Sequence, residues 1–144
     1  MNGNSSLMNL SDWIDKHADF SPGKVAVRCG ALELTYAEMA RDVSRMAAGL
    51  KAPLGVERGD RVALLAQNTA QTLVIAFACA RLGAIFQPLN WRQAAPEHIY
   101  VLSDSRPKAL FVASPLHNLV NGIADDLPTM TFISLDEDAE TDWP

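Results

Sequence analysis

The chain has 144 residues, of which 49% are hydrophobic and 20% charged, and this length and composition fit one globular domain with a buried core. Its formal net charge is −5, but five of its 17 acidic side chains fall within residues 136–142, so the rest of the chain balances 12 acidic against 12 basic side chains. A neutral body without a basic stripe argues against nucleic acid as a partner.

Three sequence patterns bear on where the protein resides. The longest uncharged apolar run, residues 73–80, is shorter than the roughly 20 residues needed to cross a bilayer, so we expect no transmembrane segment. The N-terminus has no basic stretch followed by an apolar block, so no signal peptide is predicted. Cys29 and Cys79 lie far apart in apolar surroundings, which fits core packing in a reducing compartment. We therefore expect a cytoplasmic protein.

The N-terminal third predicts a helix and a hairpin. Residues 1–8 show no apolar period, and we expect them to be disordered. Apolar residues at helical spacing predict a helix from Leu10 to Phe20, where Ser-Pro-Gly follows. Residues 25–29 and 32–35 are short strand-like runs separated by Gly-Ala, which is typical of a β-hairpin.

A second helix is expected directly after the hairpin. Thr35 and Glu38 have the spacing of a capping box, in which each side chain accepts a hydrogen bond from a free backbone N–H group of the other. An apolar stripe between residues 39 and 50 indicates that this helix packs on a flat surface. Residues 61–65 form a continuous apolar run, which predicts a buried parallel strand.

Residues 59–92 read as a strand, a helix and a second strand. Asn68 is expected to cap the helix, with Gln71 in the capping-box position. Because residues 73–82 are apolar on nearly every face, this helix should lie deep in the fold. The second strand is expected at residues 84–86.

Strands and helices continue to alternate along the rest of the chain. A helix is expected from Pro96 to about Asp104, with Ile99, Tyr100 and Leu102 on its apolar side. The remaining elements are a strand at 108–112, a helix capped by Ser114 and ending near Asn121, and a strand at 131–134. The predicted fold is therefore α/β, a parallel sheet with helices on both faces, preceded by an N-terminal helix and a β-hairpin.

The end of the strand at 84–86 carries the strongest candidate site. Parallel strands deliver the residues that follow them to the carboxyl edge of the sheet, where open α/β folds bind ligands. There Asn90 is placed to cap a turn, the ring of Trp91 to stack on a ligand, and the guanidinium of Arg92 to bind phosphate. The structural alternative is that Arg92 pairs with a carboxylate while Trp91 covers the core.

The sequence does not indicate a phosphate-binding loop, a metal site or a catalytic nucleophile. No two glycines are closer than four residues, so no phosphate-binding loop is present. His17, His98 and His117 fall in three separate predicted helices, and we expect surface or capping roles for them and no metal site. No serine or cysteine has the setting of a nucleophile, so no catalytic residue is predicted.

Five short motifs follow one another along the chain: Leu34–Met39 (LTYAEM), Gly59–Leu65 (GDRVALL), Asn68, Gly83-Ala84 followed by Pro88–Arg92 (PLNWR), and Leu102–Ser105 (LSDS). In this order they resemble the N-terminal part of the AMP-forming acyl-CoA synthetases. These belong to the superfamily of acyl/aryl-CoA ligases, peptide-synthetase adenylation domains and luciferases. The resemblance covers roughly residues 9–135, with residues 136–144 as an acidic tail at a truncation point.

The resemblance implies a parent enzyme that adenylates a carboxylic acid with ATP and Mg²⁺ and passes the acyl group to coenzyme A. In that family the phosphate loop, the acid pocket and the catalytic lysine come later in the chain. The fragment itself is therefore expected to be inactive and to hold no cofactor. The resemblance also implies that Arg92 contacts the phosphates of coenzyme A.

Expected partners are the remainder of the synthetase chain and, through apolar surface left exposed, a second copy of the fragment. Two alternatives stay open: a short, non-catalytic binding or interaction module of the same fold, and a fragment of a peptide-synthetase adenylation domain.

Overall fold

The computed structural model describes residues 8–135, so the expectations for residues 1–7 and for the acidic tail at 136–144 lie outside the described part. Its elements, in chain order, are α1 (Leu10–Phe20), β1 (Val25–Cys29), β2 (Leu32–Thr35), α2 (Tyr36–Lys51), β3 (Arg61–Leu65), α3 (Ala70–Leu82), β4 (Ile85–Pro88), α4 (Ala95–Ser105), β5 (Ala109–Val112), α5 (His117–Asn121) and β6 (Thr131–Ser134). Short 3₁₀ helices lie at Ser114–Leu116 and Ala124–Asp126.

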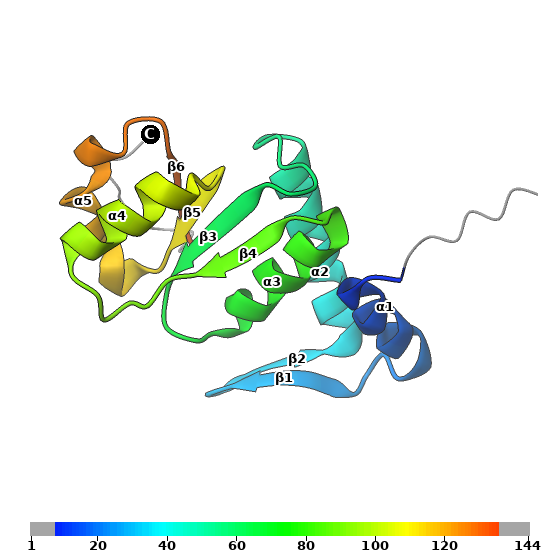
Figure 1. Ribbon diagram of the computed structural model, residues 1–144. Helices are drawn as coiled ribbons and strands as arrows, with labels where there is room; N and C mark the ends of the chain where they lie inside the picture. Colours follow the sequence, from blue (N-terminus) through cyan, green and yellow to red (C-terminus); the bar gives the residue numbers. More distant parts are fainter. Residues whose placement is uncertain (1–7, 136–144) are drawn as a thin grey trace, which may run out of the picture.

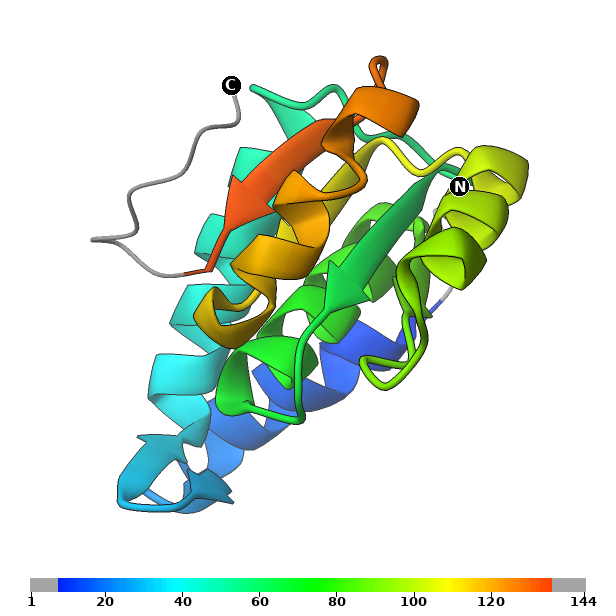
Figure 2. The ribbon, with the colours of Figure 1, turned by 90° about the vertical axis from the view of Figure 1, so that its left-hand side faces the viewer.

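The central sheet has four strands in the order β4-β3-β5-β6, and all neighbouring strands run parallel. Helices cover both faces of this sheet, and the β1-β2 hairpin forms a separate antiparallel sheet beneath α2 and α3 (Figures 1 and 2). The α/β fold with a preceding helix and hairpin is therefore confirmed.

Strand β3 separates two hydrophobic cores. Because side chains alternate along a strand, Val62 and Leu64 face one side, where they pack with residues of α2 and α3. Ala63 and Leu65 face the other side, where they pack with residues of α4, α5 and β6. All four side chains are at most 2% exposed. The continuous apolar run in the sequence thus reflects a strand buried on both faces.

A third, smaller core joins α1 and the hairpin to the sheet layer. It is built from Ile14 of α1, Met39 and Val43 of α2, and Val74 of α3. The predicted capping box fixes the start of α2: the Thr35 backbone N–H donates to the Glu38 carboxylate at 2.8 Å, and the Glu38 N–H donates to the Thr35 hydroxyl at 3.3 Å. The Thr35 N–H and the Thr35 hydroxyl both donate to the Glu38 carboxylate, and these two hydrogen bonds hold the pKa of Glu38 below its usual value.

Two predicted helix starts are wrong. Helix α3 begins at Ala70 rather than after Asn68, and the Thr69 N–H donates to the Thr72 hydroxyl at 3.1 Å, so this pair takes the place of Asn68 and Gln71. Ser114 does not cap a helix, because it lies inside a 3₁₀ turn that Ala113 precedes, and α5 starts only at His117.

Helix α4 packs on the sheet through Leu102 and Ile99, as predicted. The placement of Tyr100 on the same side is wrong, because Tyr100 is 75% exposed and His98 is fully buried instead. Residues 95, 98, 102 and 105 recur at helical spacing, and this face packs over the sheet while Tyr100 points outward. On this buried face Ser105 accepts a hydrogen bond from the side chain of Gln87 on β4 at 3.0 Å.

One arginine ties the three N-terminal helices together. Arg81 of α3 donates to both carboxylate oxygens of Asp15 on α1, each at 2.7 Å. It also donates to the hydroxyls of Ser11 on α1 and Ser44 on α2. The two bonds to Asp15 come from one guanidinium nitrogen, and the side chain of Arg81 is 22% exposed while that of Asp15 is 49% exposed, so the pair is half-shielded from water and gains from the added hydroxyl contacts.

Substitution Arg81→Met should lower the free energy of unfolding by roughly 1–3 kcal/mol, because it removes a charge-assisted network and leaves Asp15 without its partner. Urea denaturation of the purified chain measures this. Arg41→Met is the matched control, since Arg41 and Asp42 form an exposed pair at 3.8 Å, and its cost should stay within about 0.5 kcal/mol. Equal costs for the two variants would contradict a special role for Arg81.

The buried ring of His98 makes the stability depend on pH. Neither ring nitrogen has a hydrogen-bond partner among the described residues. Burial lowers the pKa of His98, and the backbone of Gln93 and the carboxylate of Glu97 only partly oppose this shift. Below about pH 6.5 His98 is therefore protonated in the unfolded chain but stays neutral in the folded chain, so the free energy of unfolding falls as the solution is acidified.

Substitution His98→Leu should raise the free energy of unfolding by about 1 kcal/mol at pH 7, because it removes two unpaired buried nitrogens. The gain should grow as the pH falls below about 6.5, because only the histidine chain loses stability when its unfolded state takes up a proton. Denaturation curves of both chains at several pH values measure the difference. An unchanged difference across this range would show that His98 titrates normally in the folded state.

Candidate functional site

The carboxyl edge of the sheet gathers the loops that follow the strands. Since β3, β4, β5 and β6 are parallel, all four end at this edge. The loop at 66–69 follows β3, the segment at 89–94 follows β4, and the turn at 113–116 follows β5. These are the positions at which open α/β sheets bind ligands.

The segment after β4 is fixed by local hydrogen bonds. Leu89 is buried, and its backbone N–H donates to the Leu64 carbonyl at 2.8 Å, so the chain stays attached to β3 at this point. The side chain of Asn90 accepts a hydrogen bond from the Arg92 N–H at 3.1 Å, and the Gln93 N–H donates to the Asn90 carbonyl at 3.0 Å. Asn90 therefore shapes the turn, as its sequence position predicts.

Trp91 and Arg92 contact each other, and Arg92 forms none of the ion pairs of the described residues. Trp91 is half-buried and packs against the core on the α4 side of the sheet, as the structural alternative expected. The Arg92 guanidinium carbon lies 4.4 Å from the centre of the Trp91 ring, within the range of a cation–π contact. None of the ion pairs found within residues 8–135 includes Arg92. The exposed guanidinium is thus held over the indole with its charge open to solvent.

The strand order adds a feature that the sequence did not reveal. After β3 the chain enters α3 on one face of the sheet, and after β5 it enters α5 on the other face. Neighbouring loops that diverge in this way mark the topological switch point at which doubly wound folds bind ligands. The loop at 66–69 and the turn at 113–116 are therefore further candidate positions, one and two strands away from the strand that precedes Arg92.

Beside the turn at 113–116 a polar contact joins α5 to the end of β6. The His117 Nε2 atom lies 3.3 Å from the hydroxyl of Ser134. The pair belongs to elements separated in sequence, and only the parallel alignment of β5 with β6 brings Ser134 to this edge.

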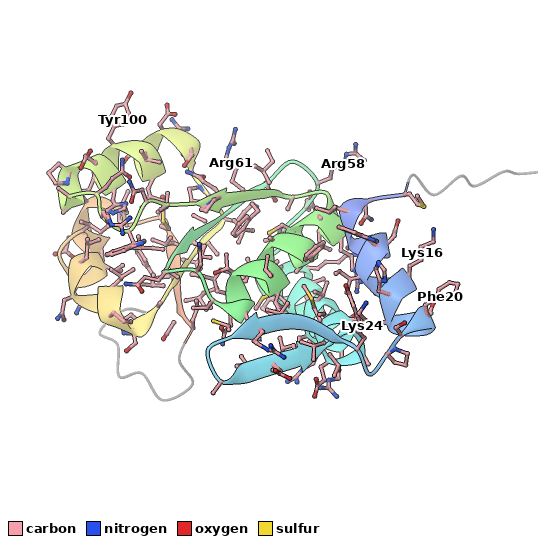
Figure 3. All side chains as sticks on the ribbon, turned by 90° about the horizontal axis from the view of Figure 1, so that it is seen from below. Lys16, Phe20, Lys24, Arg58, Arg61 and Tyr100 are labelled. Atoms are coloured by element: carbon pink, nitrogen blue, oxygen red, sulfur yellow. The ribbon has the colours of Figure 1, made fainter. Side chains whose placement is uncertain are left out.

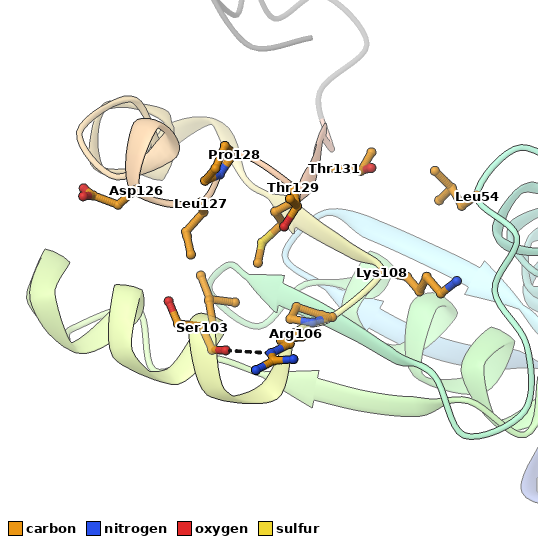
Figure 4. Close-up of a pocket in the computed structure, with 12 residues that line it drawn as sticks. Leu54, Ser103, Arg106, Lys108, Asp126, Leu127, Pro128, Thr129 and Thr131 are labelled. Atoms are coloured by element: carbon orange, nitrogen blue, oxygen red, sulfur yellow. Dashed lines mark hydrogen bonds between the residues drawn. The ribbon is translucent and has the colours of Figure 1, made fainter.

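A hollow lies at the opposite, amino edge of the sheet (Figure 4). Its volume is about 520 Å³, and it lies between the end of α4 and the loop that leads into β6. Arg106, whose backbone has φ of 47°, stands on one side and Thr129 on the other. The Arg106 Nε atom donates to the Ser103 carbonyl at 3.4 Å, and Lys108 extends away from that pair. This hollow is separated from Arg92 by the length of the strands.

Reactive groups are scarce in the described part of the chain. Cys79 is buried, and burial raises the pKa of its thiol to about 12, which makes it inert as a nucleophile. Residues 8–135 contain no group of three or more His, Cys, Asp or Glu side chains that could hold a metal ion. His17 stacks on Tyr36 with ring centres 4.8 Å apart, and His98 is buried rather than at the surface as expected. Of the helices described, none has the length and apolar character to span a membrane.

Comparison with known proteins agrees with this architecture. Residues 14–143 match the model of the family described as AMP-binding enzyme. The chain is 45% identical over 129 residues to an indoleacetate–CoA ligase of Aromatoleum aromaticum, covering 90% of this chain and 25% of that ligase. It is 39% identical over 113 residues to the long-chain-fatty-acid–CoA ligase FadD13 of Mycobacterium tuberculosis, covering 76% of this chain and 22% of that ligase.

Solved structures show the same fold. The anthranilate CoA ligase AuaEII, in complex with anthranoyl-AMP, superposes with a TM-score of 0.87 at 26% identity, over 94% of this chain and 26% of the ligase. A fatty acyl CoA synthetase of Mycobacterium tuberculosis gives a TM-score of 0.82 at 33% identity, over 94% of this chain and 29% of the synthetase.

The chain spans about a quarter of the length of the curated relatives it matches. Because the family model covers nearly all of its sequence and the carboxyl-edge turn stands in the matched region, the chain belongs to the AMP-binding enzyme family, which includes the acyl- and aryl-CoA ligases it is similar to.

Proposed function

We propose that this chain forms the N-terminal layer of an acyl-CoA synthetase. The whole enzyme would adenylate a carboxylic acid with ATP and Mg²⁺, release pyrophosphate, and transfer the acyl group to the thiol of coenzyme A with release of AMP. The names of the relatives support this: the two at 45% identity are an indoleacetate–CoA ligase and a feruloyl-CoA synthase, and the one at 39% is a long-chain-fatty-acid–CoA ligase.

Within that enzyme we assign Arg92 to the phosphates of coenzyme A. The observation that carries this assignment is the exposed guanidinium stacked on Trp91 at the carboxyl edge, outside all ion pairs of the described residues. Stacking limits the motion of the side chain, so less entropy is lost when the planar N–H groups meet a phosphate. Asn90 and Trp91 would orient Arg92 without touching the cofactor.

The described residues fit coenzyme A better than ATP. A phosphate of coenzyme A requires a free cation at an accessible edge, and Arg92 supplies one. The phosphates of ATP and their Mg²⁺ require a glycine-rich loop and carboxylates. The sequence has no such loop, and residues 8–135 lack a metal-binding cluster. We therefore assign no step of the adenylation to these residues.

In the full-length synthetase, Arg92→Ala should raise the KM for coenzyme A about tenfold, the value of one charge-assisted hydrogen bond, and leave adenylation unchanged. The KM is measured from the rate of thioester formation at varied concentrations of coenzyme A. Adenylation is measured by acid-dependent ATP–pyrophosphate exchange. Arg92→Lys should recover part of the loss, because it keeps the charge but not the planar fork.

Arg61→Ala is the matched control, since Arg61 is exposed at the amino end of β3 and points into solvent far from the turn (Figure 3). An unchanged KM for coenzyme A in Arg92→Ala would show that Arg92 does not contact coenzyme A and has a structural role only. Failure of the unmodified synthetase to form any acyl adenylate would instead overturn the proposed enzyme class.

The 144-residue chain alone should show no acid-dependent ATP–pyrophosphate exchange, because its sequence has no glycine-rich phosphate loop. The purified chain is assayed beside the full-length synthetase at equal molar concentration. Exchange by the chain alone would contradict the assignment of the ATP machinery to residues outside it.

A further inference from the structure

The turn at 89–94, which presents Arg92, leads into the first turn of α4, where His98 is buried. Figure 1 shows this segment running from the end of β4 into α4. Side chains of a helix lean toward its N-terminus, so the ring of His98 covers the start of α4 and the segment that precedes it. The described residues already bury this ring fully, so no further chain is needed to cover it.

The ring of His98 shares a core with the side chains that anchor the turn. His98 and Leu102 are the buried residues of α4, and their spacing of four places them on one face of the helix. Leu102 belongs to the same hydrophobic core as Leu89, and Trp91 packs against that core. The buried face of α4 that carries His98 therefore meets the two side chains that hold the turn.

Backbone hydrogen bonds join the turn to the start of the helix around this ring. The His98 N–H donates to the Ala94 carbonyl at 3.3 Å, and the Ala94 N–H donates to the Glu97 carboxylate at 2.8 Å. Burial lowers the pKa of His98 and the backbone of Gln93 opposes this shift, which it can do only from beside the ring. Neither ring nitrogen completes a hydrogen bond within residues 8–135.

Little charge surrounds the ring. Glu97 of α4 is the one charged side chain of the described residues that acts on the pKa of His98, and it only partly opposes the larger effect of burial. Strand β4 contributes the uncharged Gln87, which is bonded to Ser105, and the charge of Arg92 lies over Trp91. The other elements of this core contribute apolar side chains: Ala63 and Leu65 from β3, Leu110 and Val112 from β5, Val120 from α5 and Phe132 from β6. A proton on the buried ring would therefore lack a compensating partner.

We propose that His98 is a positioning residue: its neutral ring holds the turn at 89–94 in the form that presents Arg92, and a proton on the ring releases the turn. The proton comes from the solvent and binds when the turn opens, because the closed core keeps water from the ring. Opening the turn breaks few hydrogen bonds and costs less free energy than unfolding the whole layer. The consequence for coenzyme A rests on the proposed function of Arg92, whereas the coupling of His98 to the turn does not.

Hydrogen exchange of the purified chain tests the coupling. The backbone N–H groups of Leu89 and Gln93 each donate to a carbonyl and report opening of the turn, and that of Ala113, which donates to a carbonyl after β5 at the same edge, is the control. Because the open turn binds a proton with the ordinary histidine pKa of about 6.5, its opening constant should rise by up to about eightfold from about pH 7 to about pH 5.5. His98→Leu and His98→Gln should show no such rise at the same pH values, since neither side chain titrates.

Three results of the exchange experiment would overturn the proposal. An opening constant that does not rise in the parent chain would show that the ring and the turn are not coupled. An equal rise at Ala113 would show that His98 acts on the whole fold and not on the turn. A rise that persists in both His98 variants would show that another group titrates.

Kinetics of the full-length synthetase test the consequence for binding. The ratio of the KM for coenzyme A in the parent to that in His98→Leu should rise between about twofold and eightfold from about pH 7.5 to about pH 5.5, because the fraction of turn able to bind falls. A phosphate of coenzyme A that titrates near pH 6 affects both enzymes equally and leaves the ratio unchanged. The ratio of their rates of ATP–pyrophosphate exchange should stay constant.

Two outcomes separate this inference from the proposed function. If the KM ratio stays constant with pH while Arg92→Ala still raises the KM for coenzyme A, His98 does not position Arg92 and the inference is wrong. If Arg92→Ala leaves that KM unchanged, the assignment of Arg92 to coenzyme A is wrong, and the exchange experiment alone decides whether His98 holds the turn.

Discussion

The burial of β3 on both faces is the constraint on which the rest of the structure depends. This strand pairs with β4 on one side and β5 on the other, and its side chains contribute to both large cores. Every helix that covers the sheet is therefore positioned, directly or through a neighbour, by the alternation of Val62, Ala63, Leu64 and Leu65. A polar side chain at any of these positions would be buried without a partner and would weaken one whole layer.

Sequence reasoning succeeded where the deciding contacts are local. Thr35 and Glu38 are three residues apart, so their capping box is visible in the sequence and fixes the start of α2. It failed where two local signals compete. Asn68 with Gln71 and Thr69 with Thr72 are both plausible caps, and the choice is made by the core, because Ala70, Val74 and Ile75 must face inward together.

Contacts between distant parts of the chain were beyond reach of local patterns. Arg81 and Asp15 are 66 positions apart, and nothing in either segment marks the other as its partner. Likewise His98 resembles a surface residue of an amphipathic helix. The packing of Leu102 and Ser105 sets the rotation of α4 about its own axis, and this rotation buries His98. The switch point between the loops after β3 and β5 depends on strand order, which no local pattern contains.

The residue proposed for binding lies outside the cores that hold the fold together. Arg92 contacts the ring of Trp91 and contributes to none of the three cores. Strand β3 positions the turn that carries Arg92, because the Leu64 carbonyl accepts a hydrogen bond from the Leu89 N–H. Changes at Arg92 should therefore act on binding, whereas changes at Leu89 act on stability and on the turn that presents Arg92. This separation allows binding at Arg92 to be measured against an unchanged fold.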